Sequence, residues 1–227
     1  MNLYFRLSGV LMILLISCTE TTNDSEQSES ISETSNQEKI DELGNAGVDL
    51  FYESKYTEAL NKFEEILELD NQNCEAMLWK ADCLDLLRRH EESIDSYTDA
   101  IDCEPNNKTL YYNRALTYES MFDFSSAIND YNQAISMDPE DQQIPSNEDV
   151  MENLGIALGE NQQYDSAITV FKTIFEMNPK NSDSQYNIGY AFKKKGELDS
   201  AKVYLGKAVE MNPEHLTYRE ELNSLSN

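Results

Sequence analysis

A column of carboxamide side chains recurs along the chain and could hold the main chain of an extended peptide. Its members are Asn45, Trp79, Asn113, Asn153 and Asn187, with a tryptophan in the second place. A carboxamide offers a donor and an acceptor, so a row of them can bind peptide groups without reading the side chains between them. The same amides could instead bond to neighbouring helices, and the sequence leaves both roles open.

Aromatic residues accompany this carboxamide column and could anchor a protein partner, because exposed aromatic side chains are common binding hot spots. The aromatic candidates for a partner-binding groove are Trp79, Tyr52, Tyr112, Tyr186 and Tyr190. Acidic residues lie among them and would favour a partner with basic segments. For Trp79 the sequence leaves open both anchoring and packing.

The residue types that catalysis and metal binding need are scarce. His90 and His215 are the only histidines, too few for a nucleophile with a base and an orienting group. Cys74, Cys83 and Cys103 show no metal-ligand spacing. We therefore predict a non-enzymatic protein with no catalytic residues, no metal site and no cofactor. In an oxidising compartment Cys74 and Cys103 could pair, and the sequence does not decide whether they do.

Cys18 could carry a different chemistry, covalent lipidation. Residues 1–18 read MNLYFRLSGVLMILLISC, a signal-like segment whose apolar run is too short to span a bilayer of about 30 Å. Its end resembles the bacterial lipobox, which implies cleavage before Cys18 and acyl chains that anchor the protein in the cell envelope. Thr19 favours the outer over the inner membrane. An ordinary secretion signal and an uncleaved anchor are the alternatives.

Charge restricts the partners. The chain has 43 Asp and Glu against 17 Lys and Arg, a net charge of -26. This balance excludes nucleic acid as a partner and leaves the lipid anchor as the only route to a membrane. Residues 19–38 are rich in Ser, Thr and Glu and are predicted to form a disordered tether. The only basic run, residues 193–195, suits the C-terminal end of a helix, where cations interact favourably with the helix dipole. The sequence does not indicate the oligomeric state.

Four columns of residue types recur every 34 residues, with one six-residue insertion before the fourth copy, and indicate helical hairpins. The columns are Gly47, Ala81, Ala115, Gly155 and Gly189; Ala59, Ser93, Ala127, Ala167 and Ala201; Phe63, Tyr97, Tyr131, Phe171 and Leu205; Asn71, Pro105, Pro139, Pro179 and Pro213. Small residues let two helices cross closely, large ones fill the space between hairpins, and proline ends the second helix. The insertion, which contains Pro145, reads as a solvated loop or as a hinge or partner contact.

This order of residues resembles the tetratricopeptide repeat, most closely in YNIGYAFKKKGELDSAKVYLGKAVEMNP. The resemblance implies an all-α fold, a right-handed superhelical solenoid of five helix-hairpin repeats whose first helices line a concave groove. The repeats occupy 40–215, as 40–73, 74–107, 108–141, 148–181 and 182–215, followed by a capping helix and tail at 216–227.

The function that follows is a membrane-anchored scaffold that binds an extended peptide or protein in this groove. A place in an envelope assembly, secretion or motility complex would suit such a protein. The alternatives are a structural spacer without a groove ligand and a soluble secreted or cytosolic adaptor.

Overall fold

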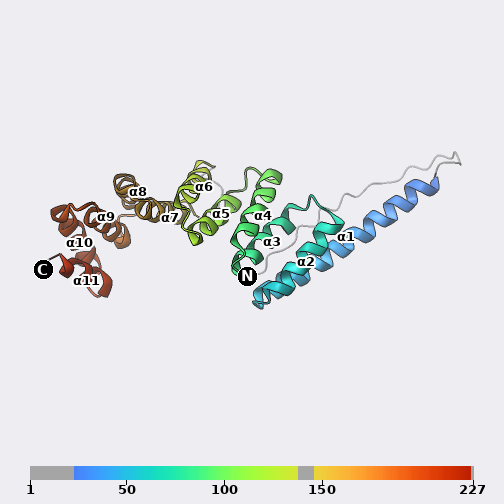
Figure 1. Ribbon diagram of the computed structural model, residues 1–227, viewed down its shortest axis with the longest axis horizontal. Helices are drawn as coiled ribbons and strands as arrows, with labels where there is room; N and C mark the ends of the chain where they lie inside the picture. Colours follow the sequence, from blue (N-terminus) through green and yellow to red (C-terminus); the bar gives the residue numbers. More distant parts are fainter. Residues whose placement is uncertain (1–22, 138–145, 226–227) are drawn as a thin grey trace. The chain divides into compact units, whose positions relative to one another are not determined.

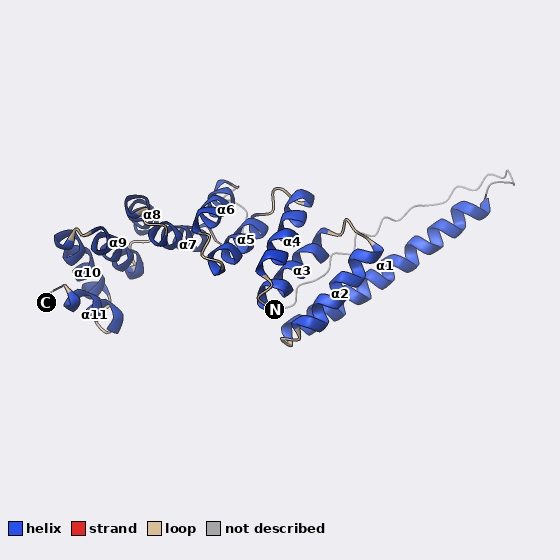
Figure 2. Ribbon diagram, viewed as in Figure 1, coloured by secondary structure: helices blue, strands red, loops and turns tan. Residues whose placement is uncertain are grey.

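The computed structural model of the chain describes residues 23–137 and 146–225, with side chains from residue 36 onward. These residues contain eleven helices and no strand (Figures 1 and 2). The predicted all-α fold is therefore confirmed. Within this part of the chain, no helix combines the length and the apolar character that crossing a membrane requires. The signal segment, Cys18 and Pro145 lie outside the described residues.

The helices form five consecutive pairs and one final helix. The pairs are α1 (Asn23–Tyr52) with α2 (Tyr56–Leu69), α3 (Cys74–Leu86) with α4 (His90–Cys103), α5 (Lys108–Ser120) with α6 (Phe124–Ser136), α7 (Asn147–Glu160) with α8 (Tyr164–Met177), and α9 (Ser182–Lys195) with α10 (Leu198–Met211). The final helix is α11 (Leu216–Ser224). From α2 to α11 each helix contacts its neighbours in the chain, which is the contact pattern of a solenoid.

The expected disordered tether differs from the structure. The chain divides into two units, Met1–Lys39 and Ile40–Asn227. In the first unit, residues 23–38 belong to helix α1 instead of being disordered. This segment contains neither Pro nor Gly, and its Glu and Gln residues are good helix formers. Acidic side chains at a helix N-terminus also interact favourably with the helix dipole, an effect that composition alone does not report.

Side-chain caps fix where the first helices of the pairs begin. The side chain of Asn73 accepts a hydrogen bond from the Ala76 main-chain nitrogen at 2.9 Å at the start of α3. Asn107 and Asn181 cap α5 and α9 in the same way. The fourth pair follows the insertion, and there Ser146 forms a capping box at the start of α7. Such caps satisfy main-chain donors that a helix leaves unpaired.

The turn inside each pair has one conformation in all five copies. Ser54, Arg88, Phe122 and Gln162 have φ angles of 61° to 62°, and Gly196 has φ of 88°. These residues recur every 34 positions, except across the six-residue insertion, so the turn is part of the repeat. Only the last copy uses glycine, the residue that reaches positive φ without steric strain.

The small column on the first helices lies against the large column on the second helices of the same pairs. A Cβ atom placed on Gly155 would lie 2.6 Å from the Phe171 ring, and one on Gly47 would lie 2.7 Å from the ring of Phe63. Because such contacts are too close, a residue larger than glycine would require these phenylalanine rings to move. Where the small residue is Ala115, the large residue is Tyr131, whose hydroxyl donates to Glu119 at 3.0 Å.

A disulfide closes the second helix pair. It joins Cys74, the first residue of α3, to Cys103, the last residue of α4, with the Cα atoms 5.8 Å apart. The sequence left this pairing undecided. Cys83, the other cysteine in the described part of the chain, is buried and free.

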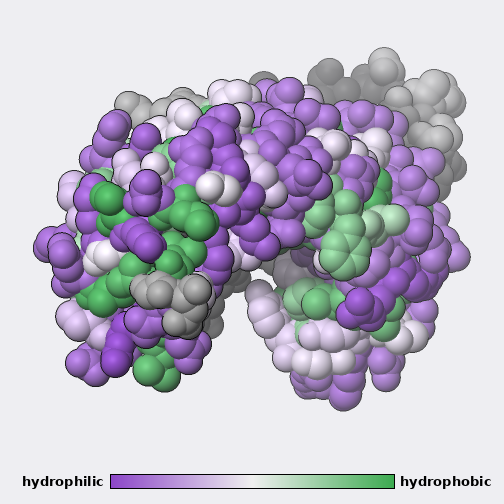
Figure 3. All heavy atoms as spheres, turned by 60° about the vertical axis from the view of Figure 1, so that its left-hand side comes forward, coloured by the Kyte–Doolittle hydropathy of each residue, from purple (hydrophilic) through white to green (hydrophobic). Residues whose placement is uncertain are grey.

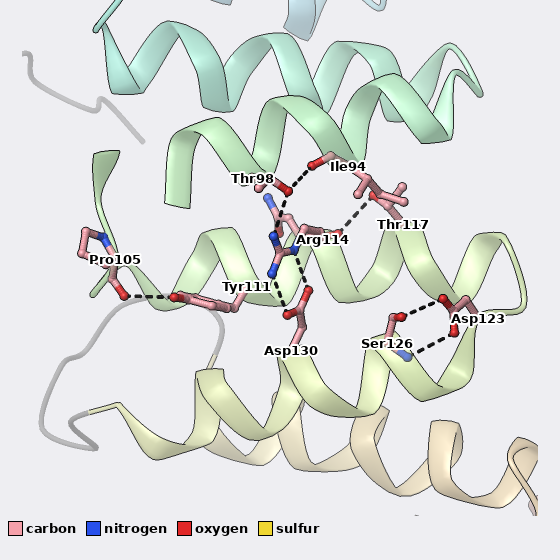
Figure 4. A network of polar contacts seen from close by, with 10 residues as sticks. Ile94, Thr98, Pro105, Tyr111, Arg114, Thr117, Asp123, Ser126 and Asp130 are labelled. Carbon is pink, nitrogen blue, oxygen red and sulfur yellow. Dashed lines mark hydrogen bonds and ion pairs between the residues drawn. The ribbon is translucent and has the colours of Figure 1, made fainter. Parts of the chain in front are cut away.

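A buried ion pair joins the helices of the third pair (Figure 4). Arg114 of α5 donates two hydrogen bonds to the Asp130 carboxylate of α6, from Nε at 2.7 Å and from Nη2 at 2.9 Å. Its Nη1 donates to Thr98 Oγ1 of α4 at 2.9 Å. The Arg114 side chain is 15% exposed and that of Asp130 8%. One guanidinium group therefore links three helices.

Candidate functional site

The carboxamide column lies on the first helices of the pairs, and two of its members bond to the preceding first helix. Asn113 Nδ2 of α5 donates to Asp82 Oδ1 of α3 at 3.2 Å. Asn153 Nδ2 of α7 donates to the Tyr112 hydroxyl of α5 at 3.0 Å. These amides thus take the inter-helix role that the sequence left open beside peptide binding. Asn45 is exposed on α1.

Trp79 packs against the first helix pair. Its ring stacks on Phe63 with centroids 5.9 Å apart and an interplanar angle of 10°. Phe51 meets the same ring edge-on at 5.1 Å, and Tyr52 does so at 6.4 Å. Packing is therefore the role that the contacts of Trp79 describe, while Tyr52 remains 73% exposed.

The remaining predicted residues gather in a pocket between α7, α8 and α9. Asn187, Tyr186 and Tyr190 line it together with residues of the other two helices, and its volume is about 320 Å³. The rings of Tyr186 and Tyr190 are stacked with centroids 6.1 Å apart. Tyr186 also stacks on Tyr218 of α11 at 5.0 Å, which fixes its orientation. The pocket is concave, partly aromatic and partly polar, as ligand sites usually are.

Among the lining residues that were not predicted as site residues, three could contribute space or charge to a ligand site. They are Gly159 and Glu160 of α7 and Lys194 of α9. The run 193–195 was interpreted as a favourable helix end, and two of its lysines do form ion pairs, Lys193 with Glu221 and Lys195 with Asp165, both at 2.6 Å. The middle lysine instead lies over the Tyr190 ring, 5.1 Å from its centre. The sequence does indicate this site through Gly159, because the other copies carry larger side chains at the same repeat position.

Asp82 is the most perturbed carboxyl group beside the carboxamide column. Burial raises the pKa of Asp82 to about 6, and the neighbouring charge of Asp85 acts in the same direction. Hydrogen bonds from the Tyr97 hydroxyl and from Asn113 oppose the shift by stabilising the carboxylate. The folded chain therefore holds a proton on Asp82 more tightly than the unfolded chain does.

We expect the Asp82→Asn variant to gain stability relative to the wild type as pH rises from 4 to 7. A raised folded-state pKa stabilises the fold below the unfolded pKa of about 4, and that stabilisation is lost as pH passes the folded value. The difference should approach about 3 kcal/mol above pH 7. Urea unfolding of both proteins at several pH values measures it. A difference that stays constant over this range would contradict the assignment.

Outside the pocket, the described part of the chain offers little for metal chemistry or catalysis. It contains no group of three or more His, Cys, Asp and Glu residues that could hold a metal ion. His90 lies with its Nδ1 3.0 Å from Asp85 Oδ1 and is partly buried. Figure 3 shows that the face in view is mostly hydrophilic with smaller separate hydrophobic areas. This surface agrees with the strongly acidic composition.

Solved structures with the same fold are numerous, and they share the helix-pair architecture. YrrB matches with a TM-score of 0.69 and 20% identity over 85% of this chain and 95% of its own. MamA matches with a TM-score of 0.70 and 19% identity over 80% and 96%. A tetratricopeptide repeat protein from Parabacteroides merdae matches with a TM-score of 0.73 and 20% identity, over 83% of this chain and 72% of its own. At such identities the likeness concerns the fold.

Among curated proteins the similarity is confined to part of each relative. A DnaJ homolog subfamily C member 3 homolog of Dictyostelium discoideum is 34% identical over 100 residues, 42% of this chain and 20% of the relative. Sperm-associated antigen 1 of Homo sapiens is 26% identical over 125 residues, 55% of this chain and 13% of the relative. The chain therefore spans a fifth or less of these two relatives.

The sequence patterns of one repeat family cover most of the helical region. The tetratricopeptide repeat matches at residues 45–108, 109–141, 148–181 and 182–215. These matches take in the helix pairs, the inter-helix bonds of the carboxamide column and the pocket described above. The chain thus belongs to the tetratricopeptide-repeat family, whose repeats serve as scaffolds for protein–protein interaction.

Proposed function

We propose that this chain is a lipid-anchored scaffold of the bacterial cell envelope that binds an extended peptide or protein partner along its first helices. The observation that carries the proposal is the pocket between α7, α8 and α9, where Asn187, Tyr186 and Tyr190 come together. YrrB, which shares the fold, is described as having an unusual peptide-binding site. A place in an envelope assembly, secretion or motility complex would suit such a scaffold.

The location outside the cytoplasm has two independent supports. Cys18 ends a segment similar to a lipobox, and it lies outside the described residues. The Cys74–Cys103 disulfide suits an oxidising compartment, since cytosolic reductants keep most thiols reduced. Thr19 favours the outer membrane.

Mass spectrometry of the mature N-terminus tests the anchor. We expect Cys18 to carry acyl chains in membranes of the producing cell, and the Cys18→Ser variant to leave the membrane fraction. An unmodified Cys18 in the mature protein would refute the anchor, while groove binding could still hold.

Partner recovery after detergent solubilisation tests the groove. We expect the Tyr190→Ala and Asn187→Ala variants to lose a co-purifying protein that the wild type retains. Val203→Ala is the matched control, because Val203 is an exposed residue of α10, a second helix. Equal recovery with all four proteins would count against binding along the first helices.

A structural spacer is the second candidate, and the inter-helix bonds of Asn113 and Asn153 favour it. Each of these two amides donates a hydrogen bond to the preceding first helix and so contributes to the stacking of the repeats. In a spacer, substitutions that line the pocket leave function unchanged. A core substitution such as Ala127→Trp, at a fully buried position, abolishes function in either case.

A further inference from the structure

A cation of the chain itself, Lys194, lies at the wall of the pocket between α7, α8 and α9. Lys194 is among the residues that line it, and its Nζ lies 5.1 Å from the centre of the Tyr190 ring. A hydrogen bond to Tyr190 raises the pKa of Lys194, and the charge of Glu160 adds to that rise. Lys194 is exposed on a flexible stem, so its ammonium group can leave the ring without unfolding α9.

The absence of a side chain at Gly159 leaves this pocket open. The other four repeats carry larger residues at the same position: Phe51, Asp85, Glu119 and Lys193. A Cβ atom on Gly159 would meet no other heavy atom within 4 Å. Gly155 differs, because a Cβ there would strike the Phe171 ring at 2.6 Å. The space above Gly159 is therefore available to a ligand, whereas that above Gly155 is occupied.

The walls of the pocket suit a positive charge. Three tyrosines contribute, Tyr164 from α8 and Tyr186 and Tyr190 from α9, and aromatic faces attract cations. Glu160 supplies the one carboxylate among the lining residues, and Lys194 supplies the one cation. Once Lys194 swings away, the site presents aromatic rings beside an acid on a chain whose net charge is -26.

We propose that this pocket is a subsite for an arginine or lysine side chain of an extended partner peptide, and that Lys194 occupies it as an internal competitor in the free protein. The inference rests on the proposed function and specifies the chemistry of its partner. Arginine should bind better than lysine, since a planar guanidinium group stacks on aromatic rings. An incoming cation displaces Lys194 without loss of charge balance at Glu160.

Titration with short peptides tests the subsite. The probe is the acetylated and amidated pentapeptide Gly-Gly-Arg-Gly-Gly, and the matched peptides carry glutamate or norleucine in place of arginine. Binding is followed by NMR of the full chain with labelled tyrosine rings. The variants are Lys194→Met, Glu160→Gln and Gly159→Leu. Gly159→Leu fills the open space and improves helix propensity, so its circular dichroism should match that of the wild type.

We expect the arginine peptide alone to bind. Lys194→Met should tighten its binding about two- to fivefold by removing the competitor, and Glu160→Gln should weaken it by a similar factor. Gly159→Leu should abolish binding. Tighter binding of the glutamate peptide, with a loss in Lys194→Met, would overturn the proposal in favour of an anion site. Equal binding of the norleucine peptide, or no saturable binding of any peptide to wild type and Lys194→Met, would also overturn it.

These outcomes are separable from failure of the proposed function. If partner recovery depends on Tyr190 while the arginine peptide does not bind, the groove hypothesis holds and the cation subsite is refuted. If the arginine peptide binds while recovery is the same in all variants, the subsite exists and the groove is not where the partner docks.

Discussion

Replacing Asp130 with alanine is expected to lower the free energy of unfolding by about 3–5 kcal/mol, the largest effect of any single change considered for this chain. The substitution leaves the guanidinium group of Arg114 buried without its carboxylate. The remaining acceptor, Thr98 Oγ1 at 2.9 Å, is uncharged and satisfies only one of its nitrogens. The two bonds drawn between Arg114 and Asp130 in Figure 4 are lost together. Urea unfolding followed by circular dichroism measures the difference.

The chain itself supplies the matched control for this prediction. The fourth repeat has Leu154 and Val170 where the third has Arg114 and Asp130. The double variant Arg114→Leu/Asp130→Val copies that apolar pair, and we expect it to recover most of the stability, because no buried charge remains unpaired. An Asp130→Ala protein within 1 kcal/mol of the wild type, or a double variant no better than the single one, would contradict a structural role for the pair.

The repeat itself could be predicted from the sequence because every copy has residues of the same size class at its buried positions. Residues similar in size to Gly155 and Phe171 occur at the same spacing in the other copies, so all five copies indicate the same helix pair. Arg114 and Asp130 form a pair in a single copy, and no column contains them. Their contact depends on two side-chain conformations across a helix crossing, which periodicity does not specify.

The candidate site divides along the same line. The carboxamide column placed Asn113, Asn153 and Asn187 on first helices, but spacing could not tell which amides bond to neighbouring helices and which line a pocket. The pocket depends on a missing side chain at Gly159, a local exception to the repeat. The tether was misjudged for a related reason. Composition indicates only that residues 23–38 can bury little apolar surface. The stability of a helix also depends on the helix propensity of its residues and on the charges near its ends.

Reduction of the Cys74–Cys103 disulfide is the second large effect that we expect. The bond spans a sequence separation of 29 residues. Closing a loop of that length lowers the entropy of the unfolded chain and so raises the free energy of unfolding by about 3–4 kcal/mol. The loop contains nearly all of α3 and α4, so the loss should be concentrated in the second helix pair. Urea unfolding with and without dithiothreitol measures it. Hydrogen exchange in α3 and α4 should accelerate more than in α9 and α10.

The Cys74→Ser/Cys103→Ser variant separates the disulfide from other effects of the reductant. Its stability should equal that of the reduced wild type and should not respond to dithiothreitol. Cys83 does not interfere, because it is fully buried and burial raises the pKa of its thiol to about 12, which keeps it protonated and unreactive. A wild-type protein whose stability is the same in both conditions would show that the two sulfurs are not joined in solution. The segment ending at Cys18 would then be the only remaining indication of a location outside the cytoplasm.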